Sequence, residues 1–246
     1  MNQFPSFSAS QPAALPALAA VLLALGGCTS QALNSEGVRL YQMGNYQQAA
    51  DQFQRAIAAN PRQATSYYNL AASLHKSGKL AGRPDDLAQA ERLYNQCLEY
   101  DPNHAECYRG LAVLLAETGR SDASFRLLEG WAARSPQLAD PRIELARLLE
   151  ENNNAEQASS RLVEALAIDP HNSRALTALG RLRENSGDRA QALANYQRSL
   201  AINRFQPEIT TRVAALQAAG AGLPASPLIT PPATRTAEQW QSSVRY

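Results

Sequence analysis

The stretch GNYQQAADQFQRAIAANP, from Gly44 to Pro61, combines an amphipathic pattern with a glycine at its start and a proline at its end. Its apolar residues recur every three or four positions, which predicts a helix with one buried face. Glycine permits the positive φ of a tight turn, and proline stops a helix because it pushes the preceding residue out of the α region. The stretch is therefore either a lone surface helix or one unit of a repeat.

The same pattern returns further along the chain, which favours the repeat. Helix-stopping prolines stand at positions 61, 102, 136 and 170, and the last two intervals are 34 residues. Small residues let paired helices approach closely, and a large apolar residue fills the space beside them, so each unit is expected to be a helical hairpin that must stack on its neighbours. The turn residues are Gly44, Gly119, Asn153 and Gly187; the small residues are Gly37, Ala71, Ala112, Ala146 and Gly180 on first helices and Ala49, Ala90, Ser124, Ala158 and Ala192 on second helices; the large residues are Phe53, Tyr94, Leu128, Leu162 and Tyr196.

The opening of the second unit, ATSYYNLAASLHKSGK, resembles the W-Y-N-L-G opening of the tetratricopeptide repeat (TPR) family. The resemblance implies an all-α fold, an α-solenoid of about five hairpins plus a closing helix at residues 205–219, in a domain spanning residues 30–219. Seven extra residues in the second unit are placed at Lys79–Asp86, where they would lengthen the turn. Trp131 stands where other units have small residues, so its ring should either open the packing or project outward.

The N-terminal residues 1–27 form a separate region, predicted to be a signal peptide of the lipoprotein type. They have no charged side chain, and their apolar run is too short to span a bilayer. Leu25 to Cys28 resembles the lipobox of bacterial lipoproteins, which implies acylation of Cys28. The alternatives are a plain secretory signal, or an uncleaved or disordered alanine-rich terminus. A helix starting at Asn34 would leave six residues as a linker that holds the first hairpin near the membrane.

Groove positions of the TPR family can be transferred to this chain one by one. They give Tyr68, Ala72, His75 and Lys76, then Arg109, Val113 and Glu117, then Ile143, Arg147, Glu150 and Glu151, then Arg174, Thr177, Arg181 and Glu184. One hypothesis is that Arg109, Arg147 and Arg181 bind acidic groups of a peptide. The alternative is local pairing, of Arg147 with Glu150 or Glu151 and of Arg181 with Glu184. The carboxylate clamp of some family members is broken, because Asn69 matches it but Val38, Glu106 and Gly110 do not.

Cys97 and Cys107 lie five residues on either side of Pro102, roughly level on adjacent antiparallel helices. They could form a disulfide in an exported chain, or they could remain buried free cysteines. No Cys/His spacing typical of a metal site occurs, and no catalytic motif is present. With a net charge of +1, the sequence also lacks the basic surface that nucleic-acid binding needs. We therefore expect neither an enzyme nor a cofactor, metal or small-molecule substrate.

These features together predict a membrane-anchored scaffold that binds a protein or peptide through a concave groove. Its expected location is the bacterial cell envelope, lipid-anchored and facing the periplasm or the exterior. Two alternatives are a pilotin-like assembly lipoprotein for a secretin, pilus or outer-membrane complex, and a noncatalytic docking subunit of an envelope enzyme complex. The region 220–246, rich in Pro, Ala and Thr, is predicted to be a flexible tail that could fold into the groove through Trp240 and Tyr246.

Overall fold

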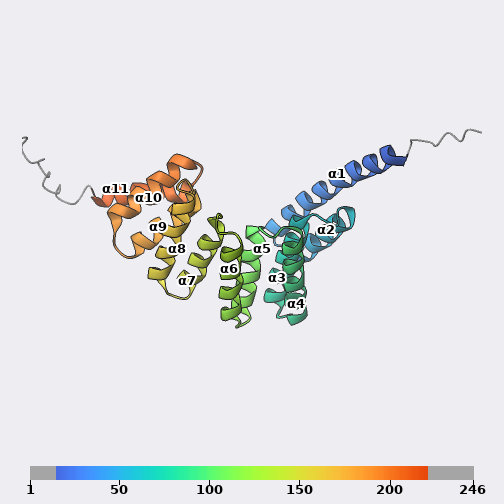
Figure 1. The fold of residues 1–246 in the computed structure, drawn as a ribbon, viewed down its shortest axis with the longest axis horizontal. Helices are drawn as coiled ribbons and strands as arrows, with labels where there is room; N and C mark the ends of the chain where they lie inside the picture. Colours follow the sequence, from blue (N-terminus) through green and yellow to red (C-terminus); the bar gives the residue numbers. More distant parts are fainter. Residues whose placement is uncertain (1–14, 221–246) are drawn as a thin grey trace, which may run out of the picture. The chain divides into compact units, whose positions relative to one another are not determined.

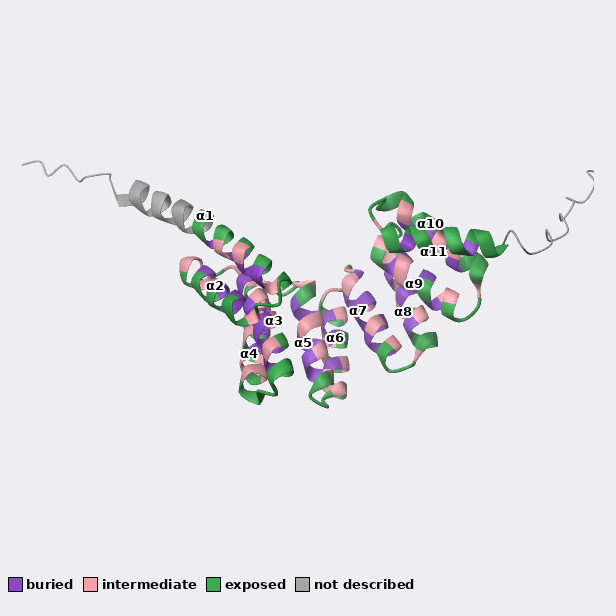
Figure 2. Cartoon of the chain, turned by 180° about the vertical axis from the view of Figure 1, so that it is seen from behind, coloured by how far each residue is buried: buried purple, intermediate pink, exposed green. Residues whose placement is uncertain are grey.

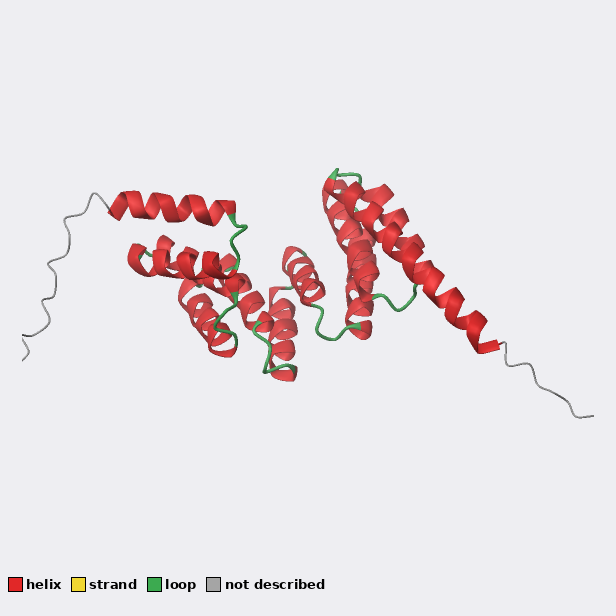
Figure 3. Cartoon of the chain, turned by 90° about the horizontal axis from the view of Figure 1, so that it is seen from above, coloured by secondary structure: helices red, strands yellow, loops and turns green. Residues whose placement is uncertain are grey.

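The computed structural model describes residues 15–220, and this part of the chain is helical with no strand (Figure 3). It divides into two compact units, residues 1–170 and 171–246. The described part of the first unit holds α1 Leu15–Gln42, α2 Tyr46–Ala59, α3 Ala64–Ala81, α4 Pro84–Tyr100, α5 Ala105–Glu117, α6 Ser121–Arg134, α7 Asp140–Glu151 and α8 Ala155–Ile168; that of the second holds α9 Ser173–Asn185, α10 Arg189–Ile202 and α11 Pro207–Gly220 (Figure 1). The predicted tail, with Trp240 and Tyr246, lies outside the described residues.

The prediction of five hairpins and a closing helix is confirmed. Consecutive helices pack as the pairs α1–α2, α3–α4, α5–α6 and α7–α8 in the first unit and α9–α10 in the second, where α11 packs on α10. In the first unit, the first helices of successive hairpins also touch one another, α1 with α3, α3 with α5 and α5 with α7. These first helices therefore form one surface layer of that unit.

The turns inside the hairpins use the residues that the sequence singled out. Gly44, Gly119, Asn153 and Gly187 all have positive φ, between 60° and 87°. In each case the next amide donates to the carbonyl five residues earlier, as Asn45 N does to Leu40 O at 2.9 Å. This Schellman arrangement satisfies the last carbonyls of the first helix and reverses the chain within a few residues.

Small residues pack against large ones at every hairpin, as predicted. Ala49, Ala90, Ser124, Ala158 and Ala192 are all fully buried, and the five large residues are at most 2% exposed. Figure 2 accordingly shows stretches of buried residues within the paired helices. At Gly37 a methyl group would stand only 2.4 Å from the Phe53 ring, so the ring occupies the space that a side chain would need.

The extra residues of the second hairpin do not lengthen its turn, so that prediction was wrong. Only two residues separate α3 from α4, and Gly82 with φ 62° makes the same reversal as the other turns. The helices are longer instead, with 18 residues in α3 against 13 in α5 and 17 in α4 against 14 in α6. Pro84 is tolerated because it falls at the start of α4, where its missing N–H has no helical partner.

Trp131 neither projects outward nor lacks partners, which corrects the outward alternative. Its side chain is fully buried and stacks on the Tyr108 ring with centroids 4.1 Å apart. Its indole N–H donates to Asn103 Oδ1 at 3.2 Å. The large ring therefore fills the junction between the second, third and fourth hairpins rather than disturbing it.

The expected helix start at Asn34 was also wrong, because α1 already runs from Leu15. Ser30 is fully buried and donates a hydrogen bond to Gln63 Oε1, while Asn34 donates to Ser66 Oγ at 2.7 Å. Helix α1 therefore packs on α3 from Ser30 onward, and no extended linker follows Cys28. Among the described helices, none combines the length and apolar character needed to cross a bilayer.

Candidate functional site

The layer of first helices in the first unit contains a cavity of about 250 Å³ between α3, α5 and α1, with Tyr94 of α4 contributing. Seven of the predicted groove residues line this cavity: Tyr68, Ala72, His75, Lys76, Arg109, Val113 and Glu117. Their spacing of three or four residues along α3 and α5 places them on one helical face. The structure thus brings these seven residues to one site.

Aromatic rings form much of the cavity wall. The Tyr68 and Tyr94 ring centroids are 6.3 Å apart, and His75 meets the Tyr94 ring edge-on at 6.2 Å. Burial raises the pKa of the Tyr94 phenol and, less strongly, of Tyr68 and Tyr41, so all three keep their hydroxyl proton at neutral pH. Their side chains therefore offer apolar faces together with neutral hydrogen-bonding groups.

A second cavity of about 240 Å³ lies beside the first and shares Tyr41, Tyr68 and Ala72 with it. Its other lining residues include Val38, Phe53 and the clamp-like Asn69. The two cavities are neighbours along α1, α3 and α5. We call the two cavities together the groove.

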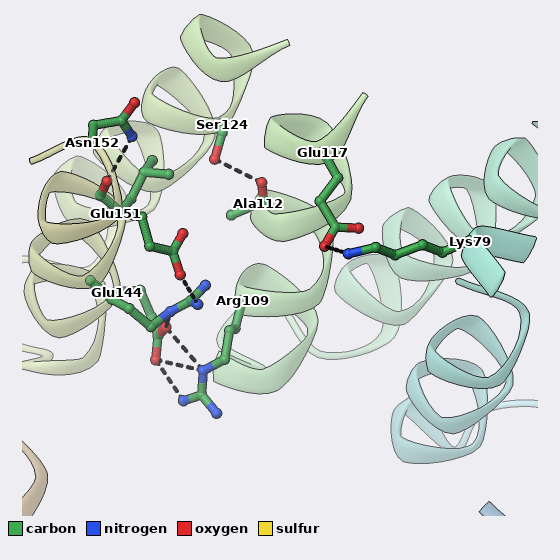
Figure 4. A network of polar contacts seen from close by, with 10 residues as sticks. Lys79, Arg109, Ala112, Glu117, Ser124, Glu144, Glu151 and Asn152 are labelled. Carbon is green, nitrogen blue, oxygen red and sulfur yellow. Dashed lines mark hydrogen bonds and ion pairs between the residues drawn. The ribbon is translucent and has the colours of Figure 1, made fainter. Parts of the chain in front are cut away.

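One end of the groove holds a carboxylate with two basic partners. Lys79 Nζ lies 2.6 Å from Glu117 Oε1 (Figure 4). His75 Nε2 lies 3.0 Å from Glu117 Oε2. Partial burial would raise the pKa of Glu117, but the hydrogen bonds from Lys79 and His75 outweigh it and lower that pKa. Glu117 is therefore ionised at neutral pH, and its charge is balanced inside the protein.

Nearer the start of α5, Arg109 reaches across to a buried acid on α7. Its guanidinium makes hydrogen bonds of 2.6 to 3.1 Å to both oxygens of Glu144, whose side chain is 1% exposed (Figure 4). The same contact raises the pKa of Arg109. Arg147 approaches Glu144 at 3.4 Å and pairs with Glu151 at 2.6 Å. Two of the three arginines that were expected to bind an acidic peptide therefore already form ion pairs with acidic residues of the same chain.

The remaining predicted residues fall elsewhere. Ile143 is 6% exposed and belongs to the core rather than to an open surface. Arg174, Thr177 and Arg181 lie on α9 in the second compact unit, where Thr177 is hydrogen-bonded to Ser199 at 2.7 Å. Glu184 accepts from Tyr196 and Arg212. Cys28 lies within α1, at a position where only the backbone is described.

Cys97 and Cys107 are joined by a disulfide between α4 and α5, with Cα atoms 6.6 Å apart. Both cysteines are fully buried beside Tyr67. His104 lies between them in the chain, and its ring contacts Tyr68 with centroids 5.5 Å apart. The disulfide therefore links two successive hairpins close to the groove.

Sequence reasoning missed Tyr41, Tyr94 and Glu144 as site residues. Tyr94 was interpreted only as a packing residue and Tyr41 was not considered, although both line the groove. Glu144 carried a usable signal: it stands three residues after Pro141 and four before Leu148, on the face of α7 that is buried. An acid on such a face needs a basic partner, and Arg109 supplies it.

Comparisons with known proteins agree with this geometry. Three models of the tetratricopeptide repeat match residues 37–78, 84–137 and 143–207, together more than half of the chain. A BBSome complex member BBS4 homolog from Drosophila melanogaster is 26% identical over 178 residues, covering 70% of this chain but only 36% of that protein.

Solved structures show the same fold. A thermophilic TPR protein from Thermus thermophilus is 22% identical with a TM-score of 0.58, over 77% of this chain and 99% of the other. The pilF protein of Pseudomonas aeruginosa is 16% identical with a TM-score of 0.52, over 80% and 86%. At these identities the likeness concerns the fold alone.

The buried acid gives the first test. Arg109→Ala leaves Glu144 with the longer contact to Arg147, so the free energy of unfolding should fall by about 1–3 kcal/mol. Adding Glu144→Gln should recover part of that loss, because it removes the buried charge that has lost its shortest contacts. Urea titrations of the single and double variants measure both effects.

Arg120→Ala is the matched control, since Arg120 also makes a two-pronged ion pair but on the surface, with Glu91. Its removal should cost about 0–1 kcal/mol. Equal losses for Arg109→Ala and Arg120→Ala, with no recovery in the double variant, would contradict a structural role for the Glu144 network.

Proposed function

Because the chain belongs to the tetratricopeptide repeat family, we propose that it is a noncatalytic scaffold whose groove binds a segment of another protein. The observation that carries this proposal is the convergence of seven groove-position residues on one cavity in the first compact unit. Concave sites with mostly apolar walls and a few polar groups are typical binding sites for peptides and other ligands. The proposed partner is a segment of another protein, and no particular protein is assigned.

The chemistry of the groove narrows what it binds. Glu117 forms an ion pair with Lys79 and a hydrogen bond with His75, and Arg109 forms an ion pair with Glu144, so these charges have partners within the protein. The groove also presents tyrosine faces and neutral hydroxyls, together with the exposed charged side chains of Lys76 and Glu106. We therefore favour a peptide segment with an aromatic or apolar anchor over a strongly acidic one.

The membrane anchor is the second part of the proposal. Acylation of Cys28 would place the lipid two residues before Ser30, which is already packed against α3. Such a short connection would hold the first hairpin, and the groove beside it, at the surface of the bilayer. The proposed setting is the bacterial cell envelope, where a pilotin-like role or a docking role in an enzyme complex would each bring a different partner.

A charge placed in the groove tests the binding site. Val113→Glu introduces a carboxylate into the cavity. A partner bound in the groove would remove the water around this charge, which is unfavourable. We therefore expect the substitution to abolish crosslinks between the partner and the groove-lining helices α3 and α5. Val163→Glu is the matched control, since Val163 is 51% exposed and lies outside the cavity. Crosslinking mass spectrometry after gentle detergent extraction provides the measurement.

The expected pattern is partner capture by the wild type and by Val163→Glu, and loss with Val113→Glu. The captured partner, a secretin or pilus protein, a peptidase or another protein, then separates the narrower roles. Unchanged capture by Val113→Glu would remove the groove from the proposal.

The Cys28→Ala variant tests the anchor. Wild-type protein expressed in a bacterium should sediment with membranes and gain the mass of a lipid on Cys28, and the variant should stay in the soluble fraction without that mass. Equal fractionation of the two proteins, with no added mass on the wild type, would show that Cys28 is no anchor.

A further inference from the structure

Three side chains with the atoms that bind soft metals meet at the junction of α4 and α5. The Sγ atoms of Cys97 and Cys107 and a ring nitrogen of His104 all lie within 4.8 Å of one another. Both cysteines are fully buried, and the His104 side chain is 11% exposed. We propose that, once the disulfide is reduced, these three residues form a binding site for Zn²⁺ or a similar thiophilic cation.

The donor set suits that class of metal. Two thiolates and one imidazole are ligands that Zn²⁺ accepts, and three protein ligands leave a fourth position for water or another oxygen donor. Glu106 can supply such an oxygen, because its Oε2 atom lies 3.3 Å from His104 Nδ1. Magnesium and calcium are not expected, because they select oxygen ligands.

The geometry needs little change of the backbone. Two thiolates on one tetrahedral Zn²⁺, each about 2.3 Å from it, stand about 3.8 Å apart. The Cα atoms of Cys97 and Cys107 are 6.6 Å apart, so rotation of the two side chains can open the space between the sulfur atoms. Cys107 lies in the first turn of α5, where the helix dipole stabilises a thiolate.

His104 is held near the cysteines by its place in the chain. It is the residue that caps α5, and its Nδ1 accepts a hydrogen bond of 3.3 Å from the Cys107 amide. Pro102 and Asn103, in the same loop, are exposed, so His104 lies close to the protein surface. The signal in the sequence is C-x6-H-x2-C, which is not one of the common zinc spacings.

A thiol reductant can reduce the Cys97–Cys107 disulfide by thiol–disulfide exchange. The disulfide takes two electrons and two protons from two thiols, which become a disulfide, and Cys97 and Cys107 become thiols. Binding of the cation then releases two protons as both thiols become thiolates. The oxidised chain offers no thiolate, so metal binding and the disulfide exclude each other.

The experiment uses the full chain with Cys28→Ala, so that only Cys97 and Cys107 carry thiols. After reduction with a phosphine and removal of oxygen, Co²⁺ is added as a spectroscopic probe. We expect one equivalent to give thiolate-to-cobalt charge-transfer absorption, which excess Zn²⁺ abolishes. Before reduction the same protein should give no such band.

Variants assign the third ligand. His104→Gln should weaken Co²⁺ binding at least about tenfold, as loss of even supporting residues does at metal sites. His171→Gln is the matched control, because His171 follows Pro170 in the corresponding loop of a later repeat, and it should bind as the parent does. Circular dichroism shows whether each variant is folded.

A second measurement keeps all three proposed ligand residues, Cys97, His104 and Cys107, in place. Bound Zn²⁺ should slow alkylation of Cys97 and Cys107 in the reduced protein, resolved by peptide mass spectrometry. Absence of both the charge-transfer band and this protection would overturn the proposal. Equal binding by His104→Gln and His171→Gln would overturn the assignment of His104.

Discussion

The close approach of the two helices in each hairpin is the constraint on which the rest of the structure depends. Alanine, glycine or serine at the contact brings the backbones together, and one large ring or leucine fills the space beside it. At Gly37 the Phe53 ring occupies the place of the missing side chain, and Gly180 meets the Tyr196 ring in the same way. Each hairpin therefore presents a defined apolar face to the next one.

The groove follows from that packing in the first compact unit. The first helices α1, α3 and α5 contact one another in turn, and Tyr41 and Tyr68 on these helices line the groove together with Tyr94 of α4. Charged residues around it are paired across hairpins, as Arg109 is with Glu144. These pairs hold neighbouring repeats in register and leave the aromatic surface open to a ligand.

Much of this fold could be predicted from the sequence because its determinants are local and periodic. A glycine with positive φ, a small residue and a helix-stopping proline act at fixed distances, so their recurrence reveals the hairpins. What depends on three-dimensional partners could not be predicted in the same way. The extra residues of the second hairpin extended α3 and α4, because Gly82 and Pro84 allow a short turn between longer helices. Glu144 was overlooked because its partner Arg109 is 35 residues away in the sequence.

The close helix contact is tested most directly by Gly37→Ala, with Gly130→Ala as its control. Alanine normally stabilises a helix by about 0.8–1.0 kcal/mol relative to glycine. At Gly130 the nearest atom to the added methyl is the flexible end of Arg134, at 3.2 Å, so the free energy of unfolding should rise. At Gly37 the methyl would meet the buried Phe53 ring at 2.4 Å, so the free energy should fall instead. A gain for Gly37→Ala equal to that for Gly130→Ala, measured by urea unfolding, would contradict the account.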